Sequence, residues 1–141
     1  ARVSATFMRP ALEQIGELML SIAGADTMES ETRRMAMELL LAVAETAGGM
    51  VRKCAPLINA TLPLAFALMS EVDEEEGWEM QEYNESNSDG IEDQESCALV
   101  GEEAVYRLAR ALQGKAVLPS AFEILPGMLA DGTSWQRRRA G

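Results

Sequence analysis

The 141-residue sequence contains no histidine, only two cysteines and few aromatic residues, which make up 5% of it. Histidine is the side chain that most often transfers protons or binds zinc near neutral pH, so its absence excludes the commonest acid–base and zinc sites. The chain also lacks a serine in a nucleophile elbow, a glycine-rich phosphate loop and a cluster with metal-ligand spacing. We therefore expect a protein that is not an enzyme and that has no cofactor and no metal site.

Long apolar runs and a cysteine framework are missing as well. No apolar run approaches the roughly 20 residues that a membrane-spanning helix needs. Cys54 and Cys97 lie in separate segments. Two isolated cysteines predict buried thiols in a reducing compartment, with a disulfide as the alternative.

What the sequence does contain is Ala, Leu and Met within a hydrophobic content of 48%, which favours helices over strands. Apolar residues recur at helical spacing in six segments, and Gly48 and Gly49 are expected to stop the second of them while Gly114 closes the fourth. The predicted helices span about residues 7–23, 31–46, 55–72, 98–112, 117–130 and, as the start of a further helix, 135–141. In the second, apolar residues surround more than half of the helix, which predicts neighbours on two or more sides.

Basic residues are absent from residues 71–95, which hold 12 of the 23 acidic residues and leave 11 acidic against 12 basic residues elsewhere. This local acidity argues against direct contact with nucleic acid and favours a basic protein or peptide as partner. A solvated spacer without a partner is the alternative. An EF-hand loop centred on Gly90 would put Ser96 where calcium requires a bidentate glutamate, so we do not predict a calcium site.

Pairs of prolines mark an internal repeat. Pro56 and Pro63 have the same spacing as Pro119 and Pro126, and Pro10 opens a partial third copy. The interval from Pro10 to Pro56 falls within the period of about 40–47 residues of two-helix HEAT repeats. The following interval is longer because it contains the acidic stretch. These features predict an all-α, HEAT-repeat α-solenoid of about three helical hairpins with an acidic insertion between helices.

The expected division of the chain follows from these markers. A helix of a first repeat occupies residues 7–24, a second repeat 30–72, the acidic loop 73–96, a third repeat 97–131 and the start of a further repeat 132–141.

Three segments in the same order resemble the importin-beta (karyopherin-beta) superfamily, with the importin-5 or karyopherin-beta-3 type as the most similar branch. They are MRPALEQIGELMLSIAG (8–24), RRMAMELLLAVAETAGGMVRK (33–53) and GEEAVYRLARALQGKAVLPSAFEILPGMLADGTSWQRRRAG (101–141). The string EVDEEEGWE (71–79) resembles the acidic loop of that family. The chain departs from the family in SWQRRRAG, where the family more often has an aromatic residue between the basic ones.

The resemblance implies an interior fragment of a nuclear import receptor that shuttles between cytoplasm and nucleus. Its partners would be basic cargo of the ribosomal-protein or histone type, Ran bound to GTP, and phenylalanine-glycine nucleoporins. A HEAT scaffold without a transport cycle, or an acidic chaperone-like module, is the alternative. The ends of the sequence, which has no initial methionine and stops within a predicted helix, also led us to expect a fragment.

The candidate partner-binding residues, for cargo or Ran, all lie in or beside the acidic stretch. They are Glu71, Asp73, Glu74, Glu75, Glu76, Trp78, Glu79, Glu82, Asp89, Glu92, Asp93 and Glu95. Arginines at predicted helix starts, Arg33, Arg34 and Arg137 to Arg139, face an unfavourable helix dipole. We expect carboxylates of a neighbouring repeat to compensate them. Most of the nine methionines are expected to fill the core.

Overall fold

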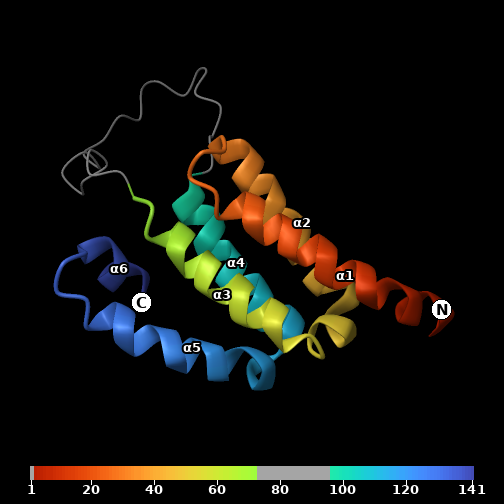
Figure 1. Cartoon of the computed structure of the whole chain (residues 1–141). Coiled ribbons are helices and arrows are strands. Elements are labelled where there is room, and N and C mark those ends of the chain that lie inside the picture. Colours follow the sequence, from red (N-terminus) through yellow and green to blue (C-terminus); the bar gives the residue numbers. More distant parts are fainter. Residues whose placement is uncertain (1, 73–95) are drawn as a thin grey trace, which may run out of the picture.

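The computed structural model describes residues 2–72 and 96–141, and every regular element in these residues is a helix (Figure 1). The helices are α1 (Arg2–Ala23), α2 (Ser30–Val51), α3 (Ala55–Met69), α4 (Cys97–Leu112), α5 (Gly114–Leu129) and α6 (Trp135–Ala140). The all-α prediction is confirmed for this part of the chain. None of the described helices has the length and apolar character to cross a membrane.

The helices form two layers. Helices α1, α3 and α5 follow one another in the first layer, and α2 packs along α4 behind it (Figure 1). Helix α6 packs on α3 and α5. Helix α2 contacts both α1 and α4, as its broad apolar surface predicts.

Neighbouring helices in the sequence do not all pack equally. Contacts are extensive between α1 and α2 and between α3 and α4, but sparse between α2 and α3. This packing favours the hairpins α1–α2 and α3–α4, and the acidic stretch would then connect the two helices of the second hairpin. The division of the chain into repeats stays a proposal.

The core lies between the two layers and is built mainly from aliphatic side chains. Helices α2 and α3 contribute equally to it and more than the other helices do, and α3 contacts helices of both layers. The most completely buried large side chains are Met37, Leu41, Leu62, Leu68 and Leu112. Cys54 and Cys97 are buried free thiols, as predicted.

The ends of several helices differ from the sequence-based expectation: α1 begins at Arg2, α3 ends at Met69 and α5 begins at Gly114. Helix α2 does not stop at Thr46: it kinks at Ala47 (φ −123°, ψ 27°) and continues to Val51. A Cβ on Gly48 would lie 3.0 Å from the carbonyl oxygen of Ala111, so this glycine permits the close approach of α4 instead of ending the helix. Helix α4 ends at Leu112; the next residue, Gln113, adopts positive φ (65°), and Gly114 already begins α5.

Arg33 connects the first turn of α2 with the end of α1 and with the residues just after α3. Its side chain is nearly buried, with 7% of the residue exposed. Nε donates to the carbonyl oxygen of Ala23 at the end of α1 (3.0 Å), and Nη1 and Nη2 donate to the two carboxylate oxygens of Glu71 (2.8 and 2.6 Å). A carboxylate does compensate Arg33, but it belongs to Glu71, which lies in the same predicted second repeat (30–72) and not in a neighbouring one. The hydrogen bond to Glu71 raises the pKa of Arg33.

Asp131 organises the turn between α5 and α6. Its carboxylate accepts hydrogen bonds from the hydroxyl and backbone N–H of Thr133 and from the backbone N–H of Ser134, at 2.8–3.0 Å. It also pairs with Arg137 (2.9 Å). The partner of Arg137 thus comes from the turn just before its own helix, not from a neighbouring repeat.

These bonds make a pH-dependent contribution to stability. The Thr133 side chain first, and then the backbone N–H groups of Thr133 and Ser134, lower the pKa of Asp131 from 3.8 to about 2. Because the pKa is lower in the folded than in the unfolded chain, the contribution to stability is complete above about pH 4 and is lost as pH falls through about 2.

We expect the difference in Tm between wild type and Asp131→Ala to be several degrees at neutral pH, on the order of that for losing a turn cap. It should shrink toward pH 2 in circular dichroism melts. Glu123→Ala, on the exposed side of α5, is the control; a difference that stays constant with pH would contradict the assignment.

Candidate partner-binding groove

A concave surface with a volume of about 350 Å³ lies between α2 and α4. Its lining combines charged side chains with an apolar floor: Glu31, Arg34, Met35, Glu38, Leu41, Val100, Glu103 and Arg107. We call this surface the α2–α4 groove. Two further voids, between core side chains, have volumes of only about 10 Å³, which is room for about one water molecule.

Helical spacing brings the lining residues to one side of each helix. On α2 the sequence places Glu31, Glu38 and Glu45 seven residues apart, which is close to two helical turns. On α4, Val100, Glu103 and Arg107 are three and four residues apart and therefore share a face. Since α2 and α4 pack side by side, the two rows face each other across the groove.

Arg107 links the two rows. Its Nη1 and Nη2 donate to the carboxylate of Glu38 (2.6 and 2.9 Å), and its Nε and Nη2 donate to the carboxylate of Glu45 (2.8 and 2.9 Å). Glu103, one turn before it on α4, lies 3.6 Å from Nη1. The guanidinium is thus surrounded by three carboxylates and makes two bidentate pairs, the strongest form of this interaction.

The pKa values follow this geometry. The hydrogen bonds to Glu45 and then to Glu38 raise the pKa of Arg107 further above its ordinary value. The same bond from Arg107 lowers the pKa of Glu45. Both shifts favour the charged forms of Arg107 and Glu45.

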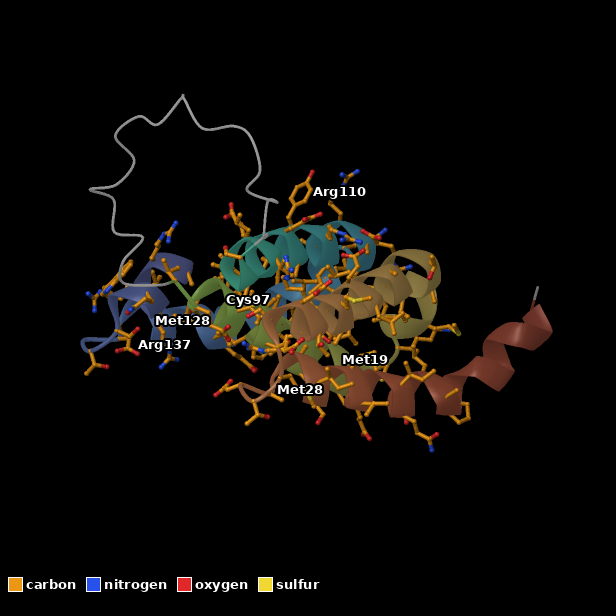
Figure 2. The ribbon with its side chains drawn as sticks, turned by 90° about the horizontal axis from the view of Figure 1, so that it is seen from above. Met19, Met28, Cys97, Arg110, Met128 and Arg137 are labelled. Atoms are coloured by element: carbon orange, nitrogen blue, oxygen red, sulfur yellow. The ribbon has the colours of Figure 1, made fainter. Side chains whose placement is uncertain are left out.

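An aromatic–arginine pair stands beside the groove on α4. The guanidinium of Arg110 lies over the ring of Tyr106, 5.5 Å from its centroid, and Nη1 donates to the Tyr106 hydroxyl (3.3 Å). Figure 2 shows Arg110 projecting from α4 on the side away from α1. Neither residue lines the α2–α4 groove.

Of the partner-binding residues predicted from the sequence, Glu71 is described, and its carboxylate is paired with Arg33. The other eleven, Asp73 to Glu95, lie outside the described residues, as does nearly all of the rejected calcium loop. Among the residues that are described, no group of three acidic, cysteine or histidine side chains could hold a metal ion.

Sequence reasoning missed the α2–α4 groove. Glu38 and Arg107 are 69 positions apart, so no local pattern connects them. The one available signal was the spacing of Glu31, Glu38 and Glu45 along one side of the second helix.

Comparisons with known proteins agree with this architecture. Residues 25–119 match the protein family described as Importin repeat. The solved structure of Kap121p bound to Pho4p is similar with a TM-score of 0.80 and 22% identity, over 94% of this chain and 13% of Kap121p. Kap121p bound to the extreme C-terminus of the protein phosphatase Cdc14p gives a TM-score of 0.79 and 22% identity, over 96% of this chain and again 13% of the other. The predicted HEAT-repeat α-solenoid is confirmed, and the chain spans a small part of the length of these structures.

Proposed function

We propose, from the premise that this chain belongs to the importin-repeat family of the importin-beta superfamily, that it forms part of a nuclear transport receptor. We further propose that the α2–α4 groove binds a Lys/Arg-rich segment of a cargo protein. The observation that carries the second proposal is the excess of carboxylates over an apolar floor in a groove that crosses two helices.

The charges of the lining suit a cationic ligand. Three carboxylates stand against two guanidinium groups, so the groove is negative by one charge; the residues are Glu31, Glu38 and Glu103 against Arg34 and Arg107. Long cationic side chains can lay their methylene stems on apolar surface while the charged end meets a carboxylate. Met35, which is 67% exposed, and the partly buried Val100 supply that surface.

A segment of extended chain suits the shape of the groove. A volume of about 350 Å³ accommodates a few side chains, not a folded domain. The complex of Kap121p with the extreme C-terminus of Cdc14p supports this mode, because a chain terminus is a short segment.

The role that we propose for the acidic stretch of residues 71–95 is based on its sequence alone. Twelve carboxylates without a basic residue would attract basic segments within about a Debye length of roughly 8–10 Å and raise the association rate. The proposed transport cycle also includes two partners, Ran bound to GTP and phenylalanine-glycine nucleoporins. In this cycle the receptor shuttles between cytoplasm and nucleus.

Fluorescence anisotropy of a short labelled peptide of alternating arginine and serine tests the groove. Glu31→Gln with Glu103→Gln removes two carboxylates and leaves all four hydrogen bonds of Arg107 intact. At about 0.7 kcal/mol for each exposed ion pair, we expect Kd to rise about tenfold. Binding of the wild-type chain should also weaken between about 0.01 M and 0.15 M salt.

The matched control is Glu17→Gln with Glu123→Gln, which removes the same charge from exposed positions on α1 and α5. We expect its Kd to change less than about twofold. If both double variants lose the same affinity for the peptide, the loss reflects net charge alone, and a binding site in the groove is contradicted. A version with residues 71–95 neutralised, measured in the same titration, separates the contribution of the acidic stretch.

A further inference from the structure

Arg107 occupies the position that a cationic ligand would take. It makes bidentate pairs with two carboxylates at once. One of these carboxylates, Glu38, lines the α2–α4 groove, and Glu103 beside it lines the groove too. Resting on the proposed function of the groove, we propose that Arg107 is a specificity-determining residue: a tethered cation that competes with the basic ligand for these carboxylates.

The exposure of the partners makes this competition possible. The side chain of Arg107 is 19% exposed, whereas those of Glu38 and Glu103 are each 58% exposed. A ligand can therefore reach the carboxylates from solvent while the guanidinium sits against the wall between the helices. A carboxylate that leaves Arg107 for a cation of the ligand exchanges one ion pair for another, so the net change in free energy is small.

The hydrogen-bond capacity of Arg107 points the same way. A guanidinium has five N–H groups, and four bonds to Glu38 and Glu45 use most of them. As long as these bonds persist, Glu38 offers a ligand only its remaining lone pairs. The charge of Arg107 also repels an incoming cation. Both effects hold the affinity for a single Lys or Arg low and select segments with several positive charges.

This role differs from that of a simple link between α2 and α4. If Arg107 only fixed the carboxylates in place for a ligand, removing it would weaken binding. If it competes, removing it frees Glu38 and Glu45 and strengthens binding. The sign of the change in Kd therefore distinguishes the two roles.

The test compares Arg107→Gln with Arg110→Gln in the anisotropy titration of the arginine–serine peptide. Arg110 lies three positions further along the same helix, carries the same charge and stacks on Tyr106 instead of pairing with Glu38. We expect Arg107→Gln to lower Kd about tenfold and Arg110→Gln to change it less than about threefold. Equal effects in the two variants, or weaker binding by Arg107→Gln, would overturn the proposal.

A further variant, and the comparison with wild type, separate failure of this inference from failure of the proposed function. Arg107→Lys retains the charge but cannot form two bidentate pairs, so it should bind more tightly than wild type even if Arg107→Gln fails to fold by circular dichroism. If the wild-type chain and the folded variants all fail to bind the peptide, the proposed function of the groove fails together with this inference. If wild type binds and the variants do not bind more tightly, the inference alone fails.

Discussion

Replacing Gly101 by alanine is expected to reduce the free energy of unfolding by about 3 kcal/mol and to lower Tm by roughly 10 °C. Gly101 is buried near the start of α4, where this helix touches α3 most closely. An added Cβ would lie 2.5 Å from the backbone nitrogen of Met69 and 2.6 Å from the carbonyl oxygen of Ala65. Because both atoms belong to the backbone of α3, no side-chain rotation can relieve the clash, and the two helices must move apart.

The matched control for this prediction is Gly127→Ala. Gly127 lies inside α5, and a Cβ there would meet nothing within 4 Å. Alanine in a helix interior is favoured over glycine by about 0.5–1 kcal/mol, so this variant should be as stable as wild type or slightly more stable. Urea denaturation followed by circular dichroism measures both. If Gly101→Ala unfolds at the wild-type midpoint, the close packing of α3 on α4 is contradicted.

Arg33→Met is expected to reduce the free energy of unfolding by about 2 kcal/mol, because it removes the bonds from α2 to the end of α1 and to Glu71 just after α3. Breaking a fully buried ion pair costs about 3–5 kcal/mol because the remaining charge is stranded. The Glu71 side chain is 38% exposed and can be rehydrated, which reduces that cost. The carbonyl oxygen of Ala23, in contrast, loses its bond to Nε in a buried position.

Two companion variants separate the contributions of Arg33. Glu71→Gln keeps an acceptor for the guanidinium and should cost less than Arg33→Met. Lys53→Met removes one positive charge from an exposed position between α2 and α3, and we expect a change within about 0.5 kcal/mol. A urea midpoint for Arg33→Met equal to that of Lys53→Met would show that the contacts of Arg33 do not stabilise the fold.

Helix positions were predictable because apolar periodicity reports directly on the buried side of a helix. The ends were less predictable, because they depend on neighbours that are distant in the sequence. Gly48 stands where a helix would ordinarily stop, but the approach of Ala111 from α4 gives the glycine a packing role within a continuing helix. Gln113 adopts the positive φ that a glycine would be expected to take.

The ion pairs show the same division between local and distant information. The unfavourable position of Arg33 at a helix start predicted a compensating carboxylate, and Glu71 supplies it. Its identity could not be predicted, because Glu71 belonged to a run of similar residues whose sequence does not separate a structural carboxylate from a binding one. The Arg107 network combines residues of α2 and α4 and becomes visible only when these helices are placed side by side.

The central claim, that a basic segment binds in the α2–α4 groove, is tested most directly by methyl NMR of the methionines. The nine methionines are natural reporters, and Met35 lines the groove while Met19, Met28 and Met128 lie elsewhere on the molecule (Figure 2). On addition of the arginine–serine peptide, we expect the Met35 methyl resonance to shift progressively to saturation and the Met128 resonance, from a buried side chain of α5, to stay in place. A saturable shift at Met19 on α1, or binding by anisotropy with Met35 unchanged, would place the ligand outside the groove and contradict the claim.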